Sequence, residues 1–575
     1  MRFPSIATLV EHAASVLRRF PWTLAAGAVA AVAAIIASGG GADERWTRIA
    51  FVAALGLPLT LSLALLGETR GWAPGRRTLV LAGGVAALVA FFFGWRGFDV
   101  PYEAIRYLLL SAALHLSVAF LPFLGVPDSL AFWQYNRRLF LGFLRAVVFS
   151  GVLFVGLAIA LGALDKLFGV HVPGETYLRI WLIVAFVVNT WIFLAAVPGA
   201  LPALGHETEY PRGLKVFAQY VLTPLAFTYL VILLAYLIKI VAGGEWPSGW
   251  IGWLVASVSV TGLLGFLLVH PLRAEPNEGW IRIYARWLFV GLVPAALMLL
   301  VAFWKRIVPY GLTEPRVLGL VLGVWLLGIA LLFTARGGAS IRLIPVTLAA
   351  LLLLTLYGPL SLTSVSVASQ ARRLARLLQA GDSAGAAREA SAALRFLIDH
   401  RAGDAIAARI GHTLPPIDWN AVPRHGGARD SVGARIMALR GARYVPEYGR
   451  AGWFQLSSNA PLPVAGFDWV LPVTMGDTST RVAGADSVAV LSGAGSAQVQ
   501  VRVGTDTLKF DLGPLVRRDG ESSRRIGQFP AESLRVEVVA GSRRAVLSLN
   551  QLSGVPSPDS VQVMFWSGWV LLGRR

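Results

Sequence analysis

A small group of charged residues stands at the ends of long hydrophobic segments, where their side chains could bind a charged ligand. Four members are basic and one is acidic: Lys239, Lys305, Arg306, Glu314 and Arg316. The topology derived below places all five at outer segment ends, where they would form a cationic mouth that holds an anionic headgroup or solute, with Glu314 as counter-charge. The alternative is that the basic side chains only reach from helix ends to the membrane surface, while nearby aromatic residues anchor the interface.

Three polar residues interrupt the hydrophobic segments themselves. His115 and Asn189 lie near the middle of their segments, and Gln219 lies one turn inside its own. A polar side chain is costly in hydrocarbon, so each is expected to face other helices or water. No Asp or Glu stands at the centre of a segment, which favours hydrogen bonding between helices over a proton relay.

Two common signatures of nucleotide and metal chemistry are absent. The sequence contains neither a Gly-x4-Gly-Lys-Ser/Thr phosphate loop nor a His-Glu-x-x-His zinc motif. It also has no cysteine, which excludes disulfides, thiolate metal ligands and cysteine nucleophiles. We therefore predict no catalytic residue, no metal site and no cofactor, and the sequence does not favour an enzyme.

The composition of the chain that positions these residues is typical of a membrane protein. Of its 575 residues, 56% are hydrophobic and 14% charged, whereas soluble proteins carry about 25% charged residues. Most hydrophobic residues fall into blocks near the ~20 residues that cross a bilayer as a helix, and blocks this long and uniform do not suit barrel strands. We predict an all-α polytopic transmembrane helix bundle with about eleven spans, at residues 21–38, 46–66, 78–94, 104–124, 144–164, 178–200, 215–241, 250–270, 282–304, 316–335 and 342–361.

The charge of the loops predicts an orientation. With Met1 in the cytoplasm, 16 of the 26 Lys and Arg residues before position 366 fall on inner segments, as the positive-inside rule requires. Residues 1–20 are then a cytoplasmic N-terminal segment, and eleven spans place the C-terminus outside, in the periplasm. A signal peptide is the alternative interpretation of the first short block, which follows Arg18 and Arg19.

The C-terminal third changes character twice. After the transmembrane domain, residues 21–365, residues 366–465 contain an amphipathic helix to 379, a second helix at about 384–410 and an irregular connector. From 466 to 575 the apolar period becomes two, in the segments 498–503, 507–512, 534–538, 545–549 and 561–565. Turn residues separate these segments, which predicts a small antiparallel β-sandwich or barrel.

Six segments between about 130 and 375 carry a resemblance. In order they are Phe132–Phe140 (FWQYNRRLF), Asp165–Gly169 (DKLFG), Tyr210–Tyr220 (YPRGLKVFAQY), Trp246–Trp250 (WPSGW), Tyr310–Arg316 (YGLTEPR) and Tyr357–Ser361 (YGPLS) with Ser369–Gln370. Together they resemble the bacterial multi-pass membrane proteins of domain of unknown function family 4153. The resemblance implies a multi-pass inner-membrane protein, and no reaction comes with it.

Two functions from different classes follow from these observations. In the first, the bundle binds or transports a lipid or small anionic solute through its outer mouth. In the second, it is an envelope scaffold or sensor whose exported β domain binds a protein partner, and a membrane-embedded transferase is a weaker third option. Membrane lipids are the expected partners in every case. Nucleic acid is not expected, because the basic residues of the tail are scattered and no base-stacking motif occurs.

Overall fold

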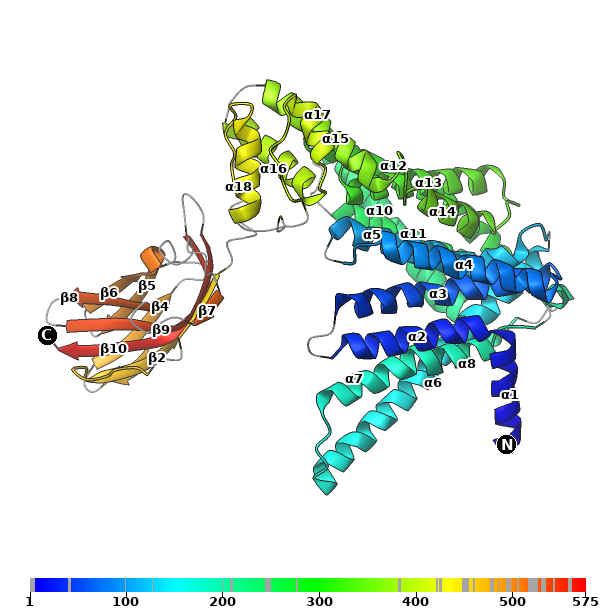
Figure 1. Ribbon diagram of the computed structural model, residues 1–575, viewed down its shortest axis with the longest axis horizontal. Coiled ribbons are helices and arrows are strands. Elements are labelled where there is room, and N and C mark those ends of the chain that lie inside the picture. Colours follow the sequence, from blue (N-terminus) through cyan, green and yellow to red (C-terminus); the bar gives the residue numbers. More distant parts are fainter. Residues whose placement is uncertain are drawn as a thin grey trace. The chain divides into compact units, whose positions relative to one another are not determined.

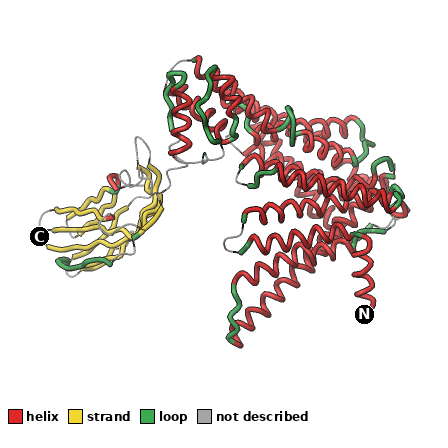
Figure 2. The backbone as a smooth tube through the Cα atoms, viewed as in Figure 1, coloured by secondary structure: helices red, strands yellow, loops and turns green. Residues whose placement is uncertain are grey.

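The computed structural model is mostly helical and ends in a β-sandwich (Figures 1 and 2). It forms two compact units, Met1–Arg373 and Leu374–Arg575. The residues that the structure describes are 6–39, 43–98, 100–126, 128–199, 201–206, 210–243, 250–275, 278–380, 384–419, 422, 427–446, 454–458, 461–475, 480–483, 486–492, 498–503, 506–515, 526–528, 534–540, 543–556 and 561–574.

The first unit is a bundle of helices that run back and forth beside one another (Figure 1). The bounds are α1 (Ile6–Arg19), α2 (Pro21–Ala37), α3 (Glu44–Thr69), α4 (Pro74–Gly94), α5 (Pro101–Phe120), η1 (Leu121–Phe123), α6 (Ser129–Phe168), α7 (Gly174–Ile183), η2 (Val184–Val188), α8 (Asn189–Ala195), η3 (Pro202–His206), α9 (Arg212–Phe217), η4 (Ala218–Leu222), α10 (Thr223–Gly243), α11 (Trp250–Val269), η5 (His270–Ala274), α12 (Gly279–Tyr310), α13 (Glu314–Ala335), α14 (Leu343–Leu354) and α15 (Leu362–Gln379). Two π-helical segments, η2 and η4, join helices into longer continuous ones.

The described part of the chain holds nine helices long and apolar enough to cross a membrane, or ten if α1 and α2 count as one bent span. The sequence predicted about eleven, so the bundle is confirmed and the count differs only slightly. The difference lies in the first and last predicted spans. The span 21–38 corresponds to α2, which has 17 residues and counts only together with α1, and the span 342–361 contains α14, which has 12 residues. At 1.5 Å per residue α14 covers about 18 Å, less than the ~30 Å of a hydrocarbon core.

The helix ends form two faces of the bundle (Figure 1). We call the first face the end at which α2, α4, α6, α9, α12 and α14 begin, and the second face the end at which α3, α5, α7, α11 and α13 begin. The segment around α14 reaches both faces despite its short helix. Arg342 donates to the carbonyls of Val126 and Asp128 beside the start of α6, and the ring of Tyr357 lies 4.7 Å from the guanidinium of Arg106 near the start of α5.

Helices of the second unit continue from α15. They are α16 (Ala384–Asp399), α17 (Gly403–Ile410) and α18 (Gly427–Ala438). The second predicted helix, 384–410, is therefore two helices. The break falls at Arg401, whose φ of 53° is left-handed and ends a helix. The predicted irregular connector also contains α18, which packs on α16.

The β-sandwich comprises β1 (Phe454–Ser457), β2 (Trp469–Thr474), β3 (Thr480–Ala483), β4 (Asp486–Ser492), β5 (Gln498–Val503), β6 (Asp506–Asp511), β7 (Ile526–Gln528), β8 (Arg535–Ala540), β9 (Arg543–Pro556) and β10 (Val561–Arg574). One sheet has the order β2-β10-β9-β1-β7 with β8 also on β9, and the other has the order β3-β4-β5-β6. Pairing is antiparallel except between β1 and β7. A single apolar core contains side chains from both sheets, including Val501, Phe510, Leu547 and Trp566, so the predicted small β domain is confirmed as a sandwich.

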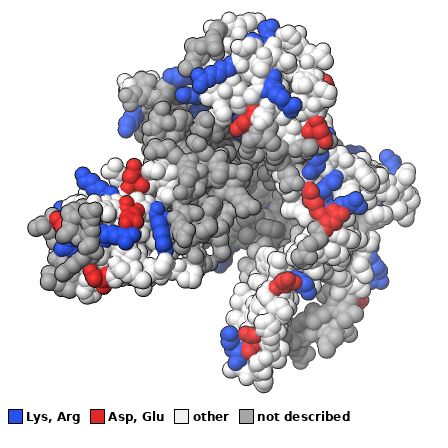
Figure 3. All heavy atoms as spheres, turned by 60° about the vertical axis from the view of Figure 1, so that its left-hand side comes forward, with Lys and Arg blue, Asp and Glu red and all other residues white. Residues whose placement is uncertain are grey.

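The described surface of the sandwich mixes charges of both signs. Figure 3 shows basic and acidic side chains interspersed on the visible face of this domain. Two ion pairs occur on this domain: Arg543 with Asp506 at 3.3 Å, and Arg544 with Glu537 at 2.6 Å. Ion pairs this exposed contribute little to stability, so the sandwich depends on its apolar core.

Candidate functional site: a pocket on the first face

A pocket of about 670 Å³ opens on the first face of the bundle. Its walls come from the start of α6, the segment just before α9, η5 after the end of α11, the start of α12 and the turn after α13. We call it the first-face pocket. Its principal side chains are Trp133, Gln134, Tyr210, His270, Arg273 and Arg282. Five chain segments distant in sequence thus converge on one cavity.

One wall of the pocket is aromatic and held in a fixed position. The rings of Trp133 and Tyr210 are stacked with their centroids 5.3 Å apart. Trp133 Nε1 donates to the carbonyl of Leu267 at 2.7 Å, and the Tyr210 hydroxyl donates to the carbonyl of Leu268 at 2.9 Å. These two carbonyls belong to the last turn of α11, where a helix leaves them without a partner of its own. Burial raises the pKa of Tyr210 to about 12, so its hydroxyl stays a donor.

A second part of the lining carries two arginines. Arg273 donates through Nη2 to the carbonyl of Gly337 at 2.9 Å, and Arg282 donates through Nη1 to the carbonyl of Arg273 at 3.1 Å. Carbonyl partners orient a guanidinium but do not neutralise its charge. Glu275 is the acidic residue of the lining, so the two arginines outnumber it and the pocket carries net positive charge.

An ion pair joins α9 to the segment before α12, near the pocket residues Tyr210 and Arg282 in the sequence. Lys215, in the first turns of α9, pairs with Glu278 just before α12, and Trp280 Nε1 donates to the other carboxylate oxygen of Glu278 at 2.6 Å. The hydrogen bond from Lys215 lowers the pKa of Glu278. The pair joins α9 to the segment before α12. Lys215 neutralises Glu278, so this carboxylate does not offset the charge of the two pocket arginines.

This arrangement suits an anionic ligand with an apolar or planar part. Arginine donors match phosphate and carboxylate oxygens in a bidentate way, and the stacked aromatic pair supplies an apolar surface. The volume lies within the about 300–1,000 Å³ of small-molecule sites. No group of three or more His, Asp or Glu side chains suited to a metal occurs among the described residues.

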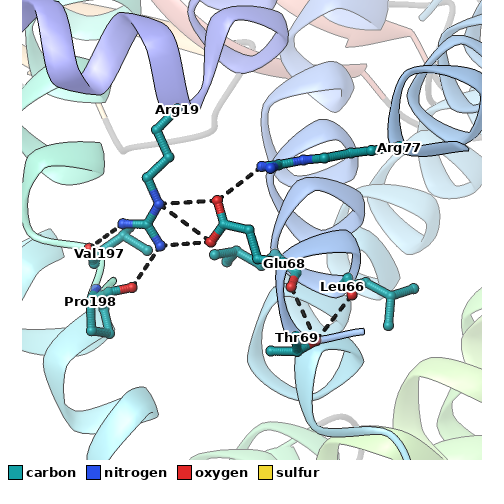
Figure 4. A network of polar contacts seen from close by, with 8 residues as sticks. Arg19, Leu66, Glu68, Thr69, Arg77, Val197 and Pro198 are labelled. Atoms are coloured by element: carbon teal, nitrogen blue, oxygen red, sulfur yellow. Dashed lines mark hydrogen bonds and ion pairs between the residues drawn. The ribbon is translucent and has the colours of Figure 1, made fainter. Parts of the chain in front are cut away.

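A second polar network fixes the helices at the same face (Figure 4). Arg19 donates to both carboxylate oxygens of Glu68, with its Nη2 2.8 Å from Oε2, and Arg77 Nη2 lies 2.9 Å from Oε1 of the same carboxylate. Arg19 also donates to the carbonyls of Val197 at 2.9 Å and Pro198 at 2.7 Å. The network joins α1, α3, α4 and the turn after α8, and it holds the 95° bend between α1 and α2.

The five predicted outer residues stand on the second face. Four of them lie at the end of α12 or the start of α13, and Lys239 lies on α10. Arg316, in the first turn of α13, donates to the carbonyl of Gly311 at 2.6 Å, and Arg306 lies within electrostatic range of it. Glu314 is buried at the same helix start, and Lys305 lies on the last turns of α12. Lys239 is exposed on α10 and has no hydrogen-bond or ion-pair partner among the described residues.

A contact that the sequence did not indicate organises this second face. Gln370, on α15, donates to the carbonyls of Tyr310 and Leu312 at 3.0 and 2.9 Å. Gly311 between them has a φ of 69°, and a Cβ there would lie 2.9 Å from Gln370 Nε2. Glycine is therefore required at this turn. The contact joins two segments of the resemblance, Tyr310–Arg316 and Ser369–Gln370.

The three intramembrane polar residues occupy different surroundings. Asn189 begins α8 directly after the π-helical η2 and accepts a hydrogen bond from Ser150 of α6 at 3.4 Å. Gln219 is half-buried inside the π-helical η4. His115 is exposed on α5, and its Nδ1 lies 2.8 Å from the carbonyl of Ser111 on the same helix. The structure does not bring these three residues together in a common contact.

The sequence indicates some segments of the first-face pocket but no role for them. Phe132–Phe140 and Tyr210–Tyr220 are segments of the resemblance, and the predicted topology places both of them, together with His270–Arg273, on the inner side. That shared side was the available signal. Arg282 is one of the basic residues predicted on that side, but only the folded bundle brings it and the turn at Gly337 to the same cavity. Most of the segment Trp246–Trp250 lies outside the described residues.

Comparison with known proteins agrees with this architecture. The protein "Uncharacterized protein PM1469" of Pasteurella multocida (strain Pm70) is 25% identical over 338 residues, a match that covers 58% of this chain and 55% of that relative. The chain thus matches about half the length of that protein. No solved structure matches it. The family described as domain of unknown function DUF4153 matches residues 23–397, most of the chain and every segment of the resemblance. This chain is therefore a multi-pass membrane protein that belongs to the DUF4153 family.

Proposed function

We propose that this protein binds an anionic ligand in the first-face pocket, either the phosphate-bearing headgroup of a membrane lipid or a small anionic solute. The observation that carries the proposal is the meeting of Arg273 and Arg282 with the stacked Trp133 and Tyr210 in one cavity of 670 Å³. The ligand class is the one expected from the charged outer residues, but the binding site is on the opposite face of the bundle.

The arginines and the aromatic pair would contact different parts of the ligand. The guanidinium groups are oriented by the carbonyls of Gly337 and Arg273, so little side-chain entropy is lost when an anion binds them. The aromatic wall then covers the apolar part of the ligand. Binding is expected to weaken as salt concentration rises, because charges near the surface are screened over a Debye length of about 10 Å at 0.1 M.

Isothermal titration calorimetry with protein in nanodiscs of phosphatidylcholine tests this assignment. Glycerol phosphate and inorganic phosphate serve as soluble probes, and nanodiscs that contain phosphatidylglycerol supply the lipid headgroup. If the site takes a solute, the probes bind in phosphatidylcholine discs. If it takes a headgroup, phosphatidylglycerol competes with the probes.

Arg273→Gln and Arg282→Gln should each weaken probe binding about tenfold or more, the loss of a charge-assisted contact of about 1.5–3 kcal/mol. Arg286→Gln is the matched control, since Arg286 is exposed one turn further along α12 and does not line the pocket. Equal binding by all three variants and the unaltered protein would contradict the proposed site.

We also propose that the first face is cytoplasmic and that the C-terminal unit is periplasmic, in a bacterial inner membrane. The loop charges support this orientation. The absence of cysteine makes single-cysteine labelling free of background. In intact cells stripped of their outer membrane, a membrane-impermeant maleimide should label Lys166→Cys at the end of α6. It should label Arg336→Cys at the end of α13 only after lysis. The reverse pattern would overturn the orientation.

A further inference from the structure

A second cavity of about 420 Å³ lies between α2, α3 and α4, away from the first-face pocket. Its lining is apolar apart from Thr60, and it includes Ala25, Ala53, Val85 and Phe92. The Thr60 hydroxyl is already bonded to the carbonyl of Gly56 at 2.7 Å and to Thr23 at 2.9 Å. The Thr60 hydroxyl is therefore satisfied within the protein, and the walls of the cavity are almost entirely apolar. We call it the lateral groove.

The lateral groove follows the direction of the helices. Trp22, in the first turn of α2, marks its first-face end, while Ile49 near the start of α3 and Phe93 near the end of α4 mark its second-face end. Its rim is open sideways, because Val29 and Val89 are half exposed. α3 and α4 are spanning helices, so a groove along them lies at the depth of the lipid chains.

The second-face end of the groove is cationic. Arg48 stacks on the ring of Phe92, with its guanidinium carbon 4.7 Å from the ring centroid, and donates to the carbonyls of Phe92 and Trp95. Two carbonyls orient this charge. Asp43 and Glu44 are acidic residues at the same helix start, and together with Arg45, Arg48 and Arg96 they leave the net formal charge of this end positive. Arg45 and Arg96 stand exposed nearby in sequence, and Arg45 is paired with Asp43. An apolar slot that ends at an oriented arginine matches a chain with a negative head.

We propose that the lateral groove holds one acyl chain of an anionic phospholipid, with its phosphate at Arg48. Its volume lies in the about 300–1,000 Å³ of ligand sites, and water or a polar peptide would leave unsatisfied hydrogen bonds against its walls. An acyl chain fits the apolar walls and a phosphate fits the charge of Arg48, so one phospholipid molecule matches both parts of the site. The site is independent of the first-face pocket.

Native mass spectrometry of the purified full chain tests the proposal with two lipids, phosphatidylglycerol and phosphatidylcholine. The unaltered protein should retain one phosphatidylglycerol molecule at the groove in preference to phosphatidylcholine, in addition to any molecule held in the first-face pocket. Ala53→Phe and Val85→Phe fill the groove and should lose this adduct, whereas Ala87→Phe, on the exposed side of α4, should keep it. Arg48→Gln should keep lipid binding but lose the preference for phosphatidylglycerol.

A measurement without substitutions covers the case in which a phenylalanine variant fails to fold. The unaltered protein in nanodiscs is irradiated with phosphatidylglycerol that carries a diazirine at its acyl end, and the adducts are mapped by peptide. Adducts concentrated on the groove residues of α2, α3 and α4 support the proposal. An even spread that includes α6, where Val152 is 68% exposed, would show annular lipid only and overturn it. A dimer whose interface protects the groove would also overturn it.

Discussion

The sandwich and the bundle bury their apolar residues by different rules. The three valines of β5, Val499, Val501 and Val503, are buried, while Gln498 and Arg502 are exposed. The hydrophobic effect is therefore enough to decide which face of this strand is buried. In α6, the apolar Val152 and Ile159 are each 68% exposed. Apolar character therefore does not decide which side of α6 faces its neighbours, because lipid tails are as apolar as a helix interface.

Two other features select the helix contacts. Small residues permit close approach: a Cβ on Gly291 of α12 would lie 2.8 Å from the Leu230 side chain of α10. Arginines at the first face bind carbonyls far along the chain, as Arg19 does with Pro198 and Arg342 with Asp128. The comparison teaches that the sandwich is specified by which residues are apolar, and the bundle by where its few small and polar residues lie.

The largest expected effect is on the sandwich core. Trp566→Ala removes a fully buried side chain of β10 and should lower the free energy of unfolding of the sandwich by about 3–5 kcal/mol. Urea unfolding of the intact chain in micelles, followed by proteolysis of the C-terminal unit, measures it. Trp469→Ala on the neighbouring β2 is the control, since Trp469 is 45% exposed. Similar losses in both variants would mean that burial does not specify this domain.

A smaller effect tests the polar ends of the bundle. Glu68→Gln leaves Arg19 and Arg77 without their shared anion and should cost about 2 kcal/mol, as expected for hydrogen bonds to charged groups. Thermal unfolding in detergent reports the loss. Glu175→Gln breaks an exposed pair with Arg179 and should cost less than about 1 kcal/mol. If the two variants melt alike, polar ends do not hold the bundle together.

A charge-preserving change sharpens the same point. Arg342→Lys keeps the positive charge but loses the fork that donates to two carbonyls at once, those of Val126 and Asp128. We expect a loss of about 1 kcal/mol, the usual value of one hydrogen bond, in the same melting assay. Arg336→Lys, at an exposed arginine, should leave the melting temperature unchanged. No loss at position 342 would show that charge alone matters there.

The smallest effect depends on pH. The hydrogen bond from Lys215 lowers the pKa of Glu278 below its ordinary value of 4.5. The stability that this pair contributes is therefore fully present above pH 4.5 and is lost as the pH falls through the lowered pKa. Glu278→Gln should show a melting temperature that differs from the unaltered protein at pH 7 and converges with it at low pH. A constant difference across this range would exclude the ion pair as its cause.

The sequence determined the elements whose signal is local. Blocks of apolar residues near membrane length predicted the bundle, and the change to period two predicted the sandwich, with the strand 498–503 matching β5. These signals are local because a helix closes its hydrogen bonds within four residues and a strand alternates between neighbours. The family resemblance also rested on short contiguous segments, and it is confirmed over residues 23–397.

Only the tertiary structure decided which distant segments share a site. Trp133 and Tyr210 stack although 77 positions separate them in the sequence, and Arg273 and Gly337 join across 64 positions. Because apolar surfaces face lipid and helix alike, the apolar pattern does not say which helices pair. The choice depends on close approaches such as Gly291 against Leu230 and on carbonyls left open at helix ends. Neither exists until the chain is folded.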